Sequence, residues 1–180
     1  MYQPHYCEEN MWHLCQTPQF NGWDCRVLFI TNPIRCCALW NQRAVPQPGQ
    51  PILWDYHVVM LGSPSGDKGT WQIWDHDSTL GSPVPLGDYL QGTFGLGSFF
   101  EKVPKRFRPK FRMLQTQDFL ANFSSDRSHM LSENGNFLQP PPSWPPINQK
   151  GPSNLSQFCD LETPFLGEIL DLLDVAQIDK

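Results

Sequence analysis

The sequence predicts an α+β fold in which helices pack on a mostly antiparallel central sheet. Residues 51–61 (PILWDYHVVML) are almost continuously apolar and rich in β-forming side chains, as is typical of a central strand. Residues 63–69 contain the glycines of a hairpin loop, so the β-rich run at residues 70–75 (TWQIWD) is expected to pair antiparallel with 51–61. Apolar residues at helical spacing in residues 7–17 and 163–177 supply the helices.

Length and composition favour one globular domain, residues 1–180. Hydrophobic residues make up 39% of the chain and aromatic residues 13%, which is enough apolar material for a core. The net charge of −5 argues against general affinity for nucleic acid or anionic membranes. No apolar run reaches the ~18 residues of a membrane span, and the first ten residues lack the features of a signal peptide. We therefore expect a cytoplasmic and nuclear protein.

The six cysteines are expected to be reduced, because such a compartment keeps thiols reduced. They contain no C-x-x-C pair, and two of them are adjacent, which argues against a zinc knuckle or a thioredoxin-like site. The six are Cys7, Cys15, Cys25, Cys36, Cys37 and Cys159.

The first half of the chain contains three more predicted elements besides the central strand. The helix at residues 7–17 carries acidic residues in its first turn. Residues 26–30 and 37–40 are apolar and β-rich, and each predicts a short strand. Between them and the central strand lies a polar loop rich in proline and glycine at residues 42–50.

The second half is richer in loops. Residues 107–114 alternate apolar and basic side chains, which predicts a strand with one basic face, and Pro109 predicts that it lies at a sheet edge. A short helix is expected at residues 118–123, followed by a polar loop with structural hydrogen bonds at residues 125–135. The prolines of residues 140–146 predict extended chain.

Cys7 is the first candidate for chemistry. It directly precedes a predicted helix, so its sulfur is expected near unpaired backbone N–H groups and the positive end of the helix dipole. That position lowers the pKa of a thiol and favours the nucleophilic thiolate. The alternative is a small, buried apolar side chain.

His57 and Asp75 are candidates for a base and the group that orients it. His57 lies within the apolar strand, where its ring nitrogens need partners. Asp75 and Asp77 end the next strand, so pairing of the two strands brings a carboxylate to one ring nitrogen. A histidine satisfied within the core is the alternative.

A metal site is the less favoured interpretation of the same residues. His57, Asp75, His76 and Asp77 offer suitable ligand atoms, but neighbours on a strand point to opposite faces. Cys7, His13 and Cys15 lack the usual zinc spacing. We therefore expect no metal.

The basic run at residues 102–112 contains six Lys and Arg residues with interleaved phenylalanines. Sites for single-stranded nucleic acid have this composition. An edge strand guarded by charge has it too, and the acidic remainder of the chain favours that second interpretation.

Several strings, in order along the chain, resemble the family of WDYHV-motif proteins, the protein N-terminal glutamine amidohydrolases. Residues 54–59 (WDYHVV) resemble the motif that names the family, residues 6–10 (YCEEN) its nucleophile segment, and residues 73–77 (IWDHD) its aspartate segment. Further similar strings are residues 107–112, 122–130 (NFSSDRSHM) and 140–142. The resemblance covers about residues 5–158, and the tail at residues 159–180 diverges.

The resemblance implies an α-β-α sandwich related to papain- and transglutaminase-type cysteine hydrolases. It implies a catalytic triad of Cys7, His57 and Asp75, and deamidation of N-terminal glutamine in proteins and peptides to glutamate with release of ammonia. It further implies a monomer that acts without a cofactor, upstream of arginylation in the N-degron pathway of protein degradation. The chemistry expected is attack by Cys7, protonation of the departing ammonia by His57 and hydrolysis of a thioester.

An enzyme that acts on a chain terminus must also bind the α-ammonium group, and in a desolvated pocket a carboxylate is the natural partner. Glu9 and Asp77 are the leading candidates by proximity to the triad in sequence. Glu8 and Asp55 are further candidates, and Trp54 and Trp74 are candidates for pocket walls.

Two other classes of function remain open on the residues alone. A cysteine peptidase or acyltransferase uses the same triad but cleaves or crosslinks chains. A non-enzymatic module that binds peptide termini needs no reactive thiol.

Overall fold

The computed structural model describes residues 1–64, 70–147 and 151–179. It is an α+β fold built on a six-stranded antiparallel sheet with the strand order β6-β5-β4-β1-β7-β8, as predicted in class and pairing. The strands are β1 (Trp23–Thr31), β4 (His57–Pro64), β5 (Gln72–Trp74), β6 (Val84–Pro85), β7 (Lys110–Gln115) and β8 (Glu168–Leu170). A small second sheet pairs β2 (Cys37–Leu39) with β3 (Ile52–Trp54).

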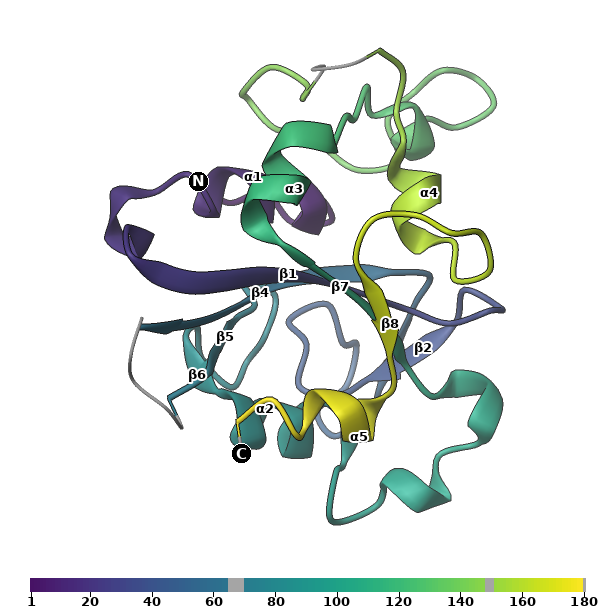
Figure 1. Cartoon of the computed structure of the whole chain (residues 1–180). Coiled ribbons are helices and arrows are strands. Elements are labelled where there is room, and N and C mark those ends of the chain that lie inside the picture. Colours follow the sequence, from purple (N-terminus) through teal and green to yellow (C-terminus); the bar gives the residue numbers. More distant parts are fainter. Residues whose placement is uncertain (65–69, 148–150, 180) are drawn as a thin grey trace.

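Helices cover both faces of the large sheet (Figure 1). One face carries α1 (Cys7–Leu14), α3 (Thr116–Asn122) and α4 (Leu155–Cys159), and the other carries α2 (Leu86–Phe94) and α5 (Leu172–Val175). Short 3-10 turns are η1 (Pro18–Phe20), η2 (Phe100–Lys102), η3 (Lys105–Phe107) and η4 (Ser128–Met130). No helix in the described part of the chain is long and apolar enough to cross a membrane.

The alternation of side chains along β1 divides the interior into two apolar clusters. Val27 and Phe29 pack with the residues of α1, α3 and α4 on one face. Leu28 and Ile30 pack with the residues of α2 and α5 on the other face. The sheet is therefore the middle of three layers, and α1, which begins with Cys7, lies against β4.

The predicted continuous strand at residues 51–61 is wrong, because the run is broken in two. Strand β3 ends at Trp54, and β4 begins at His57 in a different sheet. At the break, the backbone N–H of Tyr56 donates to the side chain of Asp55, and the Thr31 hydroxyl donates to the Asp55 carbonyl. The break places His57 at the first position of a central strand. The predicted antiparallel partner is confirmed, since Met60 lies opposite Trp74.

Of the hairpin loop expected at residues 63–69, Ser63 and Pro64 belong to β4, and residues 65–69 lie outside the described part of the chain. Other local predictions hold with shifted ends. The first helix ends at Leu14, and the strand predicted at residues 26–30 extends over Trp23–Thr31. Helices α2 and α4 were not predicted, because glycines interrupt the pattern of α2 and α4 has five residues.

The predicted edge position and basic face of residues 107–114 are wrong. Strand β7 lies between β1 and β8, and its Arg112 is buried, with 2% of its surface exposed. The guanidinium donates to the backbone carbonyls of Phe158, Leu166 and Asp160. The cation thus holds the returning tail of the chain, which covers the strand that the local pattern assigned to an edge.

The predicted helix at residues 163–177 is also wrong. The tail forms β8, which pairs with β7, and then the short helix α5, which begins with a capping box at Asp171. Gly167 adopts φ +78, and a Cβ there would collide with the carbonyl oxygen of Met113. Glycine at this position lets the tail approach β7 closely enough to pair with it. Strand pairing then satisfies the backbone N–H and C=O groups of the tail, as helical hydrogen bonds would in a helix.

Candidate active site

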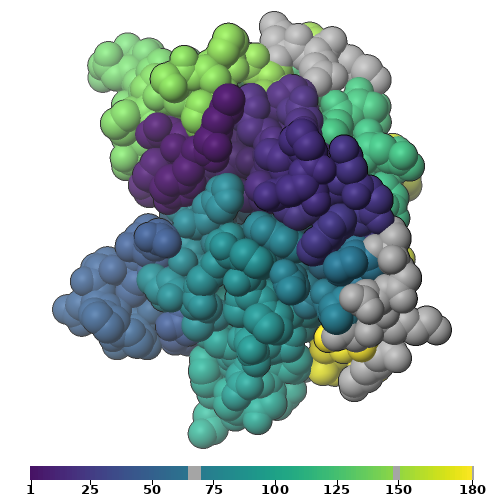
Figure 2. Space-filling model, turned by 90° about the vertical axis from the view of Figure 1, so that its left-hand side faces the viewer, coloured from purple at the N-terminus to yellow at the C-terminus, as the bar shows by residue number. Residues whose placement is uncertain are grey.

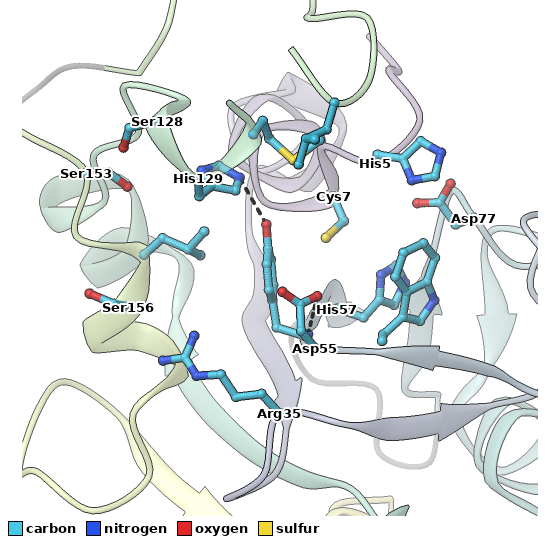
Figure 3. A pocket seen from close by; sticks show the side chains of 15 residues that line it. His5, Cys7, Arg35, Asp55, His57, Asp77, Ser128, His129, Ser153 and Ser156 are labelled. Carbon is cyan, nitrogen blue, oxygen red and sulfur yellow. Dashed lines mark hydrogen bonds between the residues drawn. The ribbon is translucent and has the colours of Figure 1, made fainter. Parts of the chain in front are cut away.

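Three distant parts of the chain meet at one end of the sheet. Cys7 is the first residue of α1, His57 the first residue of β4, and Asp75 directly follows β5. Because β4 pairs with β5 and α1 packs on β4, the three side chains converge. Cys7 and His57 line one cavity of about 490 Å³, into which the Cys7 sulfur points (Figure 3).

The ring of His57 is held by the carboxylate of Asp75. His57 Nε2 lies 2.9 Å from Asp75 Oδ1, and both side chains are buried. The other oxygen of Asp75 accepts hydrogen bonds from Gln42 Nε2 at 3.1 Å and the Tyr89 hydroxyl at 2.9 Å. The backbone N–H of Asp77 donates to Oδ1 at 2.9 Å. This network fixes Asp75 and leaves Nδ1 of His57 as the ring nitrogen that can exchange a proton.

Electrostatics favour a charged Asp75 and a readily protonated His57. Burial alone would raise the pKa of Asp75, but His57 and the hydrogen bonds from Gln42 and Tyr89 lower it to about 2. Burial would lower the pKa of His57, but the charge and hydrogen bond of Asp75 outweigh burial and raise it above 6.5. The imidazolium is therefore stabilised where it forms.

The expected lowering of the Cys7 pKa is wrong. Burial raises the pKa of this thiol well above its usual value, and the carboxylates of Glu8 and Asp77 raise it further. A hydrogen bond from the backbone of Val58 opposes these effects without reversing them. The S–H group donates to Glu8 Oε2 at 3.6 Å. The helix terminus does not decide the charge state of Cys7, because burial and the two acidic groups outweigh it; the resting side chain is a thiol.

Glu8 and two neighbours form a second polar cluster beside the sulfur. Glu8 is fully buried, and its Oε2 also accepts from the Tyr56 hydroxyl at 3.1 Å. His129 Nε2 lies 3.3 Å from the Tyr56 hydroxyl and 3.4 Å from Glu8 Oε1. Tyr56 and His129 both line the cavity. Residue types alone predicted a structural loop around His129. The only signal for a functional role of this segment was the resemblance of residues 122–130 to the family.

The predicted substrate-binding residues Asp77, Asp55 and Trp54 line the same cavity. Asp77 is nearly buried, and its Oδ1 accepts from the Tyr2 hydroxyl at 2.6 Å. Asp55 is exposed at the rim. The Trp54 ring stacks on His57 with 6.2 Å between ring centroids and an interplanar angle of 12°. Trp74, the other aromatic candidate for a wall, belongs instead to the core cluster on the α1 side of the sheet.

Glu9 takes a different position. Its carboxylate is fully buried and accepts two hydrogen bonds of 2.8 Å from Arg127, and Trp144 Nε1 donates to Oε2 at 2.7 Å. These contacts tie α1 to the segment after α3. The space-filling view shows the start of the chain lying beside residues 130–145 (Figure 2), where Gln3 and Tyr6 donate to the carbonyls of Pro140 and Gln139. Glu9 is thus a structural link, and it is not among the described residues that line the cavity.

Three residues could hold a metal ion by proximity alone. One ligand atom each of His57, Asp75 and Asp77 lies within 4.8 Å of the others. Both oxygens of Asp75 already accept hydrogen bonds from four donors. The oxygens of Asp75 are therefore already used by partners within the protein.

The basic run at residues 102–112 does not form the continuous charged stripe that a nucleic-acid strand needs. Arg112 is buried under the tail, and Arg108 pairs with Glu101 at 3.2 Å. Lys105, Arg106 and Lys110 line a separate cavity of about 700 Å³ that also contains Glu101 and Asp171.

Comparison with known proteins supplies a family. A family model described as N-terminal glutamine amidase matches residues 2–178. This match extends through residue 178, so it includes nearly all of the tail at residues 159–180 that was expected to diverge.

Curated relatives cover most of the chain. A Bos taurus protein named protein N-terminal glutamine amidohydrolase is 39% identical over 168 residues, which are 90% of this chain and 78% of that protein. The Homo sapiens protein of the same name is 37% identical with the same coverage. The Caenorhabditis elegans protein of that name is 38% identical over 159 residues, or 88% of this chain and 83% of that protein.

Proposed function

The chain belongs to the N-terminal glutamine amidase family, and from this premise we propose how it hydrolyses the side-chain amide of an N-terminal glutamine to glutamate and ammonia. The observation that carries the proposal is that Cys7 and His57 line one cavity while Asp75, behind the histidine, holds the ring through Nε2. Cys7 is the nucleophile, His57 the acid and base, and Asp75 the orienting group.

In the first step, the Cys7 thiol attacks the carboxamide carbon of the substrate while its proton moves to Nδ1 of His57. Because the resting sulfur is protonated, we propose that the transfer accompanies the attack. A carbon–sulfur bond forms, and the carbonyl oxygen becomes an oxyanion. Asp75 stabilises the imidazolium that results.

Backbone N–H groups at the start of α1 are proposed to hold the oxyanion. Cys7 is the first helical residue after Tyr6, and the first intrahelical bond is donated by Asn10. The N–H groups before it have no partner within the helix, and they lie beside the nucleophile.

In the second half of the reaction, the tetrahedral intermediate collapses and the carbon–nitrogen bond breaks. The proton on His57 passes to the departing nitrogen, so ammonia leaves and a thioester remains. His57 then takes a proton from water, which attacks the thioester. The carbon–sulfur bond breaks, the proton returns to sulfur, and the terminal glutamate is released.

Asp77 is proposed to bind the α-ammonium group of the substrate. Its carboxylate lines the cavity, close to the ring of His57, and Tyr2 occupies only one of its oxygens in the described contacts. Glu9 is less suited, because Arg127 and Trp144 already compensate its charge. Asp55, at the exposed rim, and Trp54, stacked on His57, complete the proposed pocket.

The wider setting is part of the proposal. The layered arrangement of α1 and the sheet supports a relationship to papain- and transglutaminase-type enzymes. Six free cysteines suit a reducing compartment such as the cytoplasm or nucleus. The three reacting groups come from one chain, which supports a monomer. Conversion of a terminal amide to a carboxylate supports a role upstream of arginylation in the N-degron pathway.

Ammonia release from a peptide with N-terminal glutamine tests the proposal. The wild-type protein is expected to release one ammonia per peptide without chain cleavage, and Cys7→Ala to lose nearly all of this activity. Cys36→Ala is the matched control, because Cys36 is a free thiol that is not among the described residues lining the cavity. Cleavage or amine crosslinking would favour a peptidase or acyltransferase. Binding without any reaction would favour a recognition module, and full activity of Cys7→Ala would contradict the assigned nucleophile.

A further inference from the structure

We propose that the Tyr56 hydroxyl recognises the carboxamide NH₂ group of the substrate as a hydrogen-bond acceptor, and that the buried carboxylate of Glu8 holds it in that role. The inference rests on the proposed function and names the group that distinguishes substrate from product. Tyr56 is the catalytic-site contact, and Glu8 is a positioning residue.

The proton of the Tyr56 hydroxyl points to Glu8. Tyr56 has one O–H proton, and Glu8 Oε2 lies 3.1 Å away in a fully buried carboxylate. A carboxylate can only accept, so the tyrosine must donate to it. Burial, followed by the charge of Glu8, raises the pKa of Tyr56 well above its usual value, so the phenol keeps this proton.

His129 donates a hydrogen bond to the oxygen of the Tyr56 hydroxyl. Its Nε2 lies 3.3 Å from the Tyr56 oxygen and 3.4 Å from Glu8 Oε1. Both neighbours are acceptors once the tyrosine proton points to Glu8, so Nε2 carries a hydrogen and donates. The Tyr56 oxygen thus gives its proton to Glu8 and receives one from His129. It keeps acceptor capacity only.

The Tyr56 hydroxyl lies close to the Cys7 sulfur. The Cys7 sulfur and the Tyr56 oxygen contact the same oxygen of Glu8, and both residues line the cavity. A carbon about to be attacked lies roughly 3–3.5 Å from the sulfur. Its amide nitrogen is one bond further on, within reach of a hydroxyl beside that sulfur.

This arrangement separates glutamine from glutamate by chemistry. The carboxamide offers N–H donors to the Tyr56 acceptor, whereas the carboxylate of the product offers none. The product would also face the charge of Glu8, whose side chain is fully buried. A site built around one hydrogen-bond polarity rejects the analogue that lacks the matching group. The cluster therefore binds substrate and releases product.

Binding constants in a protein that cannot turn over test this directly. In the Cys7→Ala background, Kd is measured by calorimetry for a Gln-terminal peptide and for the same peptide with N-terminal Glu. The parent is expected to favour the Gln peptide by on the order of tenfold or more. Adding Tyr56→Phe, which removes only the hydroxyl, is expected to lower this preference by about tenfold.

Glu8→Gln gives a second, opposite readout. The amide at position 8 can donate to the Tyr56 oxygen, which frees the hydroxyl proton to point into the cavity. The Glu peptide should then bind more tightly than in the parent and the Gln peptide more weakly. Tyr6→Phe is the matched control, because the buried hydroxyl of Tyr6 donates to Gln139 away from the cavity. The preference of this variant for the Gln peptide over the Glu peptide should equal that of the parent.

The ratio of the two Kd values does not depend on the folded fraction, so reduced stability of a variant leaves the test intact. An unchanged ratio in Tyr56→Phe overturns this inference. Absence of ammonia release by the wild-type protein would instead overturn the proposed function, and that measurement is made separately. Ammonia release with an unchanged ratio would therefore remove only the role of Tyr56.

Discussion

His57, the first residue of β4, and Asp75, the residue that follows the paired strand β5, form a buried hydrogen bond of 2.9 Å. The bond uses Nε2 of the ring, so the proton chemistry is left to Nδ1. It also explains why the pKa of His57 is raised although burial alone would lower it.

The pH dependence of activity follows from this pair. His57 must be neutral to accept the thiol proton, so activity rises as pH passes upward through its pKa, which is raised above 6.5. Asp75→Asn removes the charge that raises this pKa, while burial still lowers it. We expect the rising limb of kcat/KM to move to lower pH, and kcat to fall on the order of 10³–10⁴-fold.

The measurement is kcat/KM for a Gln-terminal peptide between pH 5 and 9. Asp88→Asn serves as the control, because Asp88 lies exposed on α2. A limb that stays at the same pH in Asp75→Asn would show that another group titrates.

Asp77→Asn tests the binding of the α-ammonium group. Loss of a charged hydrogen bond of about 1.5–3 kcal/mol corresponds to a rise in KM of roughly ten- to a hundredfold, with little change in kcat. Acetylation of the peptide's N-terminus should raise the KM of the wild-type protein at least as much. It should raise the KM of Asp77→Asn only a little further. Asp118→Asn, at an exposed site on α3, is the control. If the effects of acetylation and of Asp77→Asn on KM were additive, the α-ammonium group would not bind to Asp77.

Glu9→Gln is expected to destabilise the fold. The substitution leaves the buried Arg127 guanidinium without its carboxylate, which costs about 3–5 kcal/mol. Glu101→Gln is a matched control, because its pair with Arg108 is exposed and contributes less than about 1 kcal/mol. Urea unfolding gives both values. Equal midpoints for the two variants would contradict the structural role of Glu9.

Arg112→Leu is expected to loosen the tail. The variant keeps much of the volume but leaves the carbonyls of Phe158, Leu166 and Asp160 without their donor. We expect a loss of at least about 2 kcal/mol in the free energy of unfolding. Hydrogen exchange should increase in β8, and Lys110→Ala, exposed on the same strand, should leave it unchanged. Unaltered exchange in β8 would mean that strand pairing alone holds the tail.

Local signals predicted the elements whose spacing or composition is clear within their own segment. The helix at Cys7 and the strand β1 lie close to where spacing and β-forming residues put them. Strand β7 was misplaced because the burial of Arg112 depends on a tail that returns from far along the chain. The break at Asp55 was missed for a similar reason, since apolar composition alone does not distinguish one long strand from two strands in different sheets.

The sequence by itself determined which side chains are available for chemistry and, through short motifs in order, the family to which they belong. It also determined the antiparallel pairing that carries His57 to Asp75, because the two strands are close neighbours along the chain. Only the tertiary structure decided whether Cys7 is charged and which of the acidic residues is structural. Burial keeps Cys7 as a thiol, and Arg127, 118 residues away, makes Glu9 a structural link. Desolvation and ion pairing depend on what surrounds a group in space, which spacing along the chain does not contain.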